Sequence, residues 1–168
     1  MSRLMMLAFL LTTVPSAAQG PAPLTNWANF VGLWRVTSTS TTKNAASIPP
    51  IVQNIRIAGG DLTFERRDLA SGATETSRYR LDGQSARTVR DGGPVDATAA
   101  IEGTMLVIRT RPVTAAGERP TVTESYTVGR NTMMMDRTIT IGGKTTISDE
   151  ILQRIPDDYP LHGGTEFR

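Results

Sequence analysis

Between Phe30 and Ile155 the sequence consists of short segments in which polar and apolar residues alternate, with no helical period of any length. Such alternation is typical of half-buried β-strands, because successive side chains of a strand point to opposite faces. Turn-forming residues separate the segments: Gly59-Gly60-Asp61, Ser71-Gly72, Asp82-Gly83, Asp91-Gly92-Gly93-Pro94, Gly103, Ala116-Gly117, Gly129-Arg130-Asn131 and Gly142-Gly143. This pattern predicts an all-β, antiparallel up-and-down meander. Since a long meander has two unpaired edges, we expect it to close into a barrel of about 8–10 strands.

The first 18 residues have the features of a cleaved signal peptide. Arg3 supplies a basic start, residues 4–14 are apolar, and Ser16-Ala17-Ala18 places small residues where a signal peptidase cleaves. The apolar run is too short to cross a bilayer core of about 30 Å. We therefore expect a periplasmic or secreted bacterial protein with no membrane span after cleavage.

The remaining sequence divides into three parts. We expect a lead-in over 19–29 with one short helical turn, a barrel over 30–155, and a loose polar tail over 156–168. The segment over residues 41–50 is too long for a hairpin turn and ends in two prolines, so we expect a surface loop there.

Composition argues against several classes of function. The chain has no cysteine and one histidine, which excludes disulfides and thiol catalysis and leaves no Cys/His metal site. No catalytic motif or phosphate-binding loop is present. The net charge is only +2, and no basic run suggests nucleic acid as a partner. The sequence therefore predicts no enzymatic activity, no metal and no cofactor.

The stretch "NFVGLWRV", residues 29–36, places Gly32 two positions before Trp34 at the start of the first strand. It resembles the lipocalin and calycin signature, in particular that of small signal-bearing lipocalin-like proteins of bacteria. The resemblance implies that Trp34 fills the closed end of the barrel and that Arg154 of "ILQR" stacks on it. A guanidinium over an indole contributes about 0.5–2 kcal/mol.

Three hairpins carry an arginine on the outgoing strand and a carboxylate on the returning strand. Counting from the centre of each turn predicts Arg109 opposite Glu124, Arg137 opposite Asp149, and Arg66 diagonal to Glu75.

The last hairpin, Met133 to Ile151, raises the question of which way these pairs point. If it turns about Gly142-Gly143-Lys144, Arg137 and Asp149 share one face with apolar residues, namely Met133, Met135, Ile139, Ile141, Ile147 and Ile151. By the same alternation Arg109 shares a face with Tyr126, and Arg66 shares one with Phe64.

Two interpretations follow. If the pairs face outward, they are ordinary surface salt bridges. If they face inward, then Arg66, Arg109 and Arg137 with Glu75, Glu124, Asp149, Tyr126 and Met135 line a polar cavity. Such a cavity would bind a small, partly apolar molecule, and arginine would suit an anionic head group. The alternative function is a filled barrel that binds an envelope protein, or acts as an inhibitor, through the 41–50 loop.

Overall fold

A computed structural model describes residues 27–40, 48, 50–113 and 119–160. The expected signal peptide, most of the 41–50 loop, the Ala116-Gly117 turn and the end of the tail lie outside these residues. The described residues form ten strands: β1 (Gly32–Thr39), β2 (Ile51–Ala58), β3 (Asp61–Asp68), β4 (Thr74–Arg80), β5 (Ala86–Arg90), β6 (Gly93–Glu102), β7 (Met105–Pro112), β8 (Thr121–Val128), β9 (Thr132–Ile141) and β10 (Lys144–Ile155).

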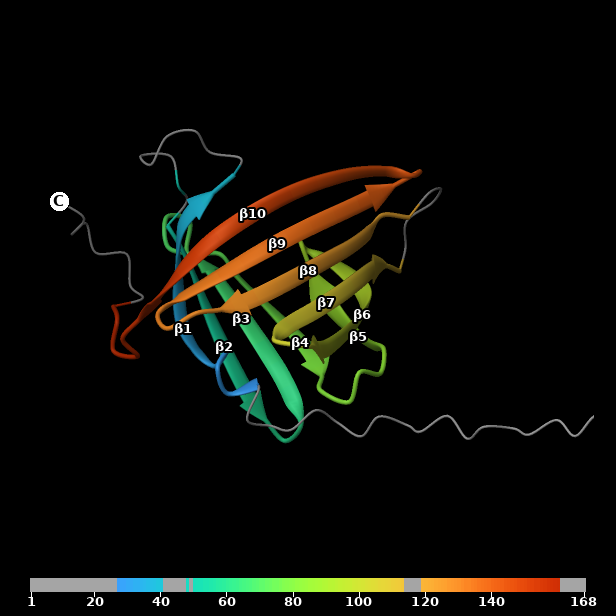
Figure 1. Cartoon of the computed structure of the whole chain (residues 1–168). Helices are drawn as coiled ribbons and strands as arrows, with labels where there is room; N and C mark the ends of the chain where they lie inside the picture. The colour runs from blue at the N-terminus through green and yellow to red at the C-terminus, as the bar shows by residue number, and fades with distance from the viewer. Residues whose placement is uncertain (1–26, 41–47, 49, 114–118, 161–168) are drawn as a thin grey trace, which may run out of the picture.

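The strands form one antiparallel meander that curls into a nearly closed barrel (Figure 1). Consecutive strands pair along the chain, and β1 also pairs with β10, so the order runs β4-β3-β2-β1-β10-β9-β8-β7-β6-β5. The predicted all-β meander is confirmed. Alternate connections lie at the same end, which places the β3–β4, β5–β6 and β9–β10 turns at one rim, together with the end of β1 and the start of β2. We call this rim the mouth.

The two end strands of the sheet, β4 and β5, meet at a seam that side chains bridge. Ser77 Oγ donates to the Val89 carbonyl at 2.6 Å, and the Arg78 amide donates to Thr88 Oγ1 at 2.8 Å. Toward the mouth, the Gly92 amide donates to Glu75 Oε2 at 3.0 Å. Side-chain oxygens therefore supply acceptors and donors at the edges where no strand ladder joins β4 to β5.

Thr88→Val should loosen this seam selectively. The substitution keeps the shape of the side chain but leaves the Arg78 amide without its acceptor, so we expect a loss of about 0.5–1.5 kcal/mol in stability. Hydrogen exchange measured by mass spectrometry should accelerate in β4 and β5 and stay unchanged in β9 and β10. Thr98→Val in the paired strand β6 is the matched control. Unchanged exchange in β4 and β5 would contradict the bridging role of Thr88.

The end of the barrel opposite the mouth is closed by aromatic side chains. The expected short turn is present, since the Phe30 amide donates to the Trp27 carbonyl at 3.0 Å, and both side chains are buried. Trp34 is fully buried, and its Nε1 donates to the Phe30 carbonyl at 3.0 Å. The Arg154 guanidinium lies 4.3 Å from the centre of the Trp34 ring, which is the contact that the resemblance implies.

A second group of buried aromatic rings occupies the middle of the barrel. Phe64 of β3 contacts Tyr79 of β4 and Tyr126 of β8, with ring centres 5.6 and 5.4 Å apart. Because β3 and β8 are distant in the sheet order, the contact between Phe64 and Tyr126 crosses the interior. These rings separate the mouth from the closed end of the barrel.

The β9–β10 hairpin differs from the prediction by one residue. Its turn consists of Gly142 and Gly143 alone, with φ of 56° and 76°, and Ile141 pairs directly with Lys144. Two consecutive residues with positive φ suit a tight hairpin turn, which glycine permits. A shift of one residue moves β10 side chains to the other face. Consequently Ile147 and Ile151 are 71% and 40% exposed instead of facing the core.

The predicted apolar face of this hairpin is correct for part of β9 only. Met133 and Met135 are buried, and Leu152 replaces Ile151 as the buried residue of β10. Ile141, at the strand end, is 47% exposed.

Candidate functional site

None of the three predicted pairings has the correct register, and two of them are wrong by one residue. Arg137 is opposite Ser148, while Asp149 is opposite Asp136. Arg109 is opposite Thr123, and Glu124 is opposite Ile108.

Arg109 consequently faces outward, where it contacts Glu102 at 2.6 Å with both side chains nearly half exposed. Tyr126, opposite the buried Leu106, faces inward, so it does not share a face with Arg109 as expected.

The third pair was predicted as a diagonal one, but Arg66 lies directly opposite Glu75. The ion-pair partner of Arg66 is nevertheless Glu150 of β10. Arg66 Nη2 and Nη1 donate to the two Glu150 carboxylate oxygens at 2.8 and 3.0 Å. Since β3 and β10 are not adjacent in the sheet, this bidentate pair spans the interior near the mouth.

Glu124 is the centre of the most buried charged group in the described part of the chain. Its side chain is 2% exposed, and Arg90, on β5, is 5% exposed. Arg90 Nη2 donates to Glu124 Oε1 at 2.6 Å, and Arg137 Nε donates to the same oxygen at 2.9 Å. Tyr126 donates its hydroxyl to Glu124 Oε2 at 3.0 Å. We call these four residues the Glu124 cluster. Arg137, Glu124 and Tyr126 therefore do face the interior, as one sequence interpretation required.

The electrostatics of the Glu124 cluster favour its charged state. Burial alone raises the pKa of Glu124, but the positive charges of Arg90 and Arg137 and their hydrogen bonds bring this pKa below its usual range. Burial also raises the pKa of Tyr126, and the neighbouring Glu124 carboxylate raises it further. Tyr126 is therefore a neutral hydrogen-bond donor to an ionised carboxylate.

This arrangement predicts a loss of stability in acid. A carboxyl whose pKa is lower in the folded state stabilises the fold fully above its unfolded value of about 4.5, and this contribution disappears as the pH falls through the folded value. Urea unfolding measured across this range should show a steeper loss below about pH 4.5 for the native chain than for Glu124→Gln. Parallel pH profiles of the two proteins would contradict this assignment.

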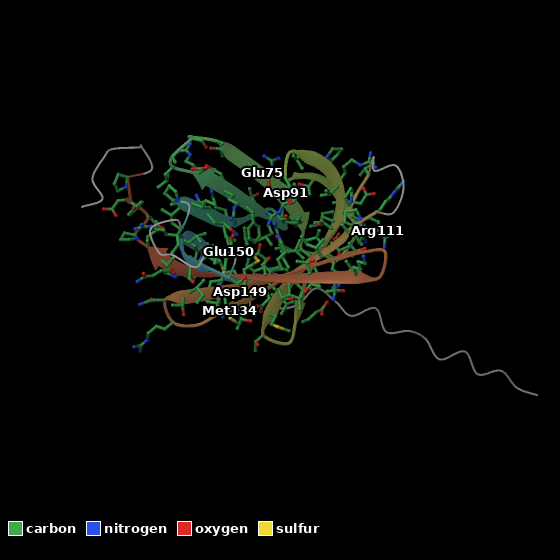
Figure 2. The ribbon with its side chains drawn as sticks, turned by 90° about the horizontal axis from the view of Figure 1, so that it is seen from above. Glu75, Asp91, Arg111, Met134, Asp149 and Glu150 are labelled. Carbon is green, nitrogen blue, oxygen red and sulfur yellow. The ribbon has the colours of Figure 1, made fainter. Side chains whose placement is uncertain are left out.

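A pocket of about 380 Å³ lies at the mouth, beside the end of the β4–β5 seam that is nearer the mouth. We call it the mouth pocket; it is lined by Ile51, Arg66, Asp68, Ala73, Thr74, Glu75 and Asp91. In Figure 2, Glu75 and Asp91 lie together on one wall, with Glu150 on the other side of the interior. Asp91 has a φ of 50°, and its Oδ2 is 3.7 Å from Arg137 Nη2. The mouth pocket thus adjoins both interior ion-pair groups.

A second pocket of about 200 Å³ lies at the closed end. Its lining carries no charged side chain and consists of Asn29, Phe30, Ile101, Gly103, Thr104 and Val128. It is smaller and lacks the convergent charged groups of the mouth pocket, which makes the mouth the stronger candidate site.

The described residues place no group of three or more His, Asp or Glu where it could hold a metal ion. In the same residues, no helix has the length and apolar character needed to cross a membrane.

No protein-family model and no curated protein matches this sequence. Solved structures do match its fold. Apo lipid binding protein 8 of Caenorhabditis elegans aligns with a TM-score of 0.60 at 10% identity, over 76% of this chain and 96% of that chain. A secretory abundant heat soluble protein of Ramazzottius varieornatus aligns with a TM-score of 0.58 at 11% identity, over 76% of this chain and 96% of that chain. Zebrafish ileal bile acid-binding protein, complexed with cholic acid, aligns with a TM-score of 0.56 at 14% identity, over 76% of this chain and 99% of that chain. The described residues therefore have the calycin fold, in a nearly closed barrel of ten strands.

Proposed function

We propose that this barrel binds a small, partly apolar molecule in the mouth pocket. The observation that carries the proposal is the pocket itself, in which apolar Ile51 and Ala73 lie beside charged side chains. Its volume of about 380 Å³ is at the lower end of the range for small-molecule sites. Structures of similar fold include proteins described as binding lipid or bile acid, which supports a binding function and not an enzymatic one.

The packed middle of the barrel limits how deep the ligand can reach. Phe64, Tyr79 and Tyr126 fill the interior below the mouth, and all three are buried. The ligand is therefore small and held near the rim, with its apolar part against Ile51 and Ala73.

The sequence suggested an anionic head group gripped by Arg137. Arg137 does reach the interior, but the Glu124 carboxylate already accepts its hydrogen bond at 2.9 Å. An anionic ligand would have to compete with that carboxylate, or with Glu150 for Arg66. An anionic ligand is therefore the alternative outcome of a binding test.

We also propose that the protein is exported. Support comes from the basic start, apolar run and small residues of the first 18 positions. N-terminal sequencing of protein recovered from an expressing bacterium should find a chain that starts near Gln19 in the periplasm or medium. An intact Met1 in the cytosol would contradict export.

The filled middle of the barrel favours a second candidate function, that of a module that binds another protein of the cell envelope through its surface. The surface suggested by the sequence, residues 41–50, lies almost entirely outside the described residues. Capture of a specific envelope protein by a barrel whose mouth pocket is blocked would favour this alternative.

Organic extraction of purified protein followed by mass spectrometry tests the leading proposal. We expect a co-purified small molecule that Ala73→Trp, which fills the mouth pocket, removes. Ala58→Trp, at the exposed end of β2 away from the mouth, should retain it. A molecule retained equally by both variants would place the binding site elsewhere.

A further inference from the structure

We propose that the mouth pocket selects a ligand with a positively charged head group, namely an organic amine or guanidine attached to a short apolar group. This inference rests on the proposed function and names the ligand class of the same site. It follows from which charges line the pocket and which of them are already engaged.

The lining of the mouth pocket is negative although the protein is not. Arg66 contributes one positive charge, while Asp68, Glu75 and Asp91 contribute three negative charges, which gives a net charge of −2. The whole chain carries +2. A concave surface of one sign concentrates ligands of the opposite sign, so this pocket favours cations.

The one cation in this lining is not free to receive an anion. Arg66 makes a bidentate pair with Glu150, with both side chains about one-fifth exposed. Bidentate guanidinium–carboxylate pairs are among the stronger polar contacts in proteins. An anionic ligand would have to displace Glu150 and then lie beside three further carboxylates.

The carboxylates, by contrast, retain acceptor capacity. Asp68 Oδ1 accepts from the Ala70 amide at 2.8 Å, and Glu75 Oε2 accepts from the Gly92 amide at 3.0 Å. These bonds fix the two side chains and use one oxygen of each, while a carboxylate has about four acceptor positions. The backbone amides of Ala70 and Ser71 lower the pKa of Asp68, which keeps it ionised. Asp91 is less free, since its Oδ2 lies 3.7 Å from Arg137 Nη2, but this long contact leaves its side chain 68% exposed and able to accept from a ligand.

An organic cation suits the site better than a metal ion does. The described acidic residues do not form a group of three that could coordinate a metal. Apolar Ile51 and Ala73 share the lining with the carboxylates, which suits a ligand that carries hydrocarbon next to its charge.

Calorimetric titration with three ligands of equal chain length tests the inference: octylammonium, octanoate and octanol. We expect octylammonium to bind about tenfold more tightly than octanoate, with octanol between them, and the preference to shrink with added salt. Tighter binding of octanoate would overturn the cation preference while leaving a ligand-binding function in place. Binding of none of the three at this site would overturn the proposed function itself.

Matched variants test whether the preference for octylammonium comes from the carboxylates of the mouth pocket. Glu75→Gln with Asp91→Asn keeps the shape of both side chains, and asparagine tolerates the positive φ at this position. We expect this double variant to weaken octylammonium binding about fivefold and to leave octanol binding unchanged. Asp96→Asn removes one carboxylate on the outer face of β6, away from the pocket, and should have no effect. Equal effects of the two changes would refute a role for Glu75 and Asp91.

Discussion

Glu124→Gln is expected to destabilise the barrel by about 3–5 kcal/mol, because it leaves the buried Arg90 guanidinium without a counter-charge. Two arginines and a tyrosine hydroxyl converge on this one carboxylate. Removal of one partner from a buried ion pair costs far more than the pair contributes, since desolvation of the remaining charge is no longer offset. Arg137, which is 25% exposed, can recover some hydration, whereas Arg90 cannot.

Urea unfolding followed by tryptophan fluorescence measures this effect. Glu102→Gln is the matched control, because Glu102 contacts Arg109 at 2.6 Å at an exposed position. That change should alter the free energy of unfolding by less than about 1 kcal/mol. A similarly small effect for Glu124→Gln would mean that the interior admits enough water to solvate Arg90.

Gly32→Ala is expected to cost about 2–4 kcal/mol, through backbone strain and a steric clash together. Gly32 has a φ of 134°, which side-chain-bearing residues rarely adopt. A Cβ atom there would lie only 2.5 Å from Arg154 Nη1. The guanidinium cannot move without loss, because it stacks on Trp34 and donates to the Val31 carbonyl at 2.8 Å. The glycine and the arginine are thus coupled through one contact.

A double-mutant cycle separates the two parts of this cost. In an Arg154→Met background the clashing atom is absent, so Gly32→Ala should cost less there, by at least about 1 kcal/mol. The remaining cost then reflects the backbone conformation of Gly32. An identical cost in both backgrounds would show that Arg154 does not constrain this position.

The strands and their order were predictable because they depend on local signals. Alternation marks each strand, and turn residues mark each reversal. The register of a hairpin is harder to predict, because it depends on the exact length of the turn. The prediction for the last hairpin counted Lys144 as part of the turn, whereas Gly142 and Gly143 alone complete it. One residue of error was enough to place Asp149 opposite Arg137 in place of Ser148. The carboxylate that Arg137 does contact, Glu124, lies on the other neighbouring strand, β8.

Contacts across the barrel had no signal in the sequence. Arg90 lies at the end of β5 next to a turn, where a charged side chain is usually exposed. It is nevertheless buried against Glu124, which is 34 residues away in the chain. Arg66 and Glu150 are separated by 84 residues. Such pairs depend on which strands face each other after closure, which a single sequence does not encode locally. The contact of Trp34 with Arg154 was expected only because a family resemblance implied it.

Backbone amide NMR resonances followed during titration with octylammonium show directly whether the mouth pocket is the ligand site. We expect shifts at Arg66, Glu75 and Asp91 of the mouth pocket. Asn29, Gly103 and Thr104 of the pocket at the closed end should not shift. Shifts confined to the closed end, or no saturable shifts with octylammonium, octanoate or octanol, would show that the ligand site is not the mouth pocket.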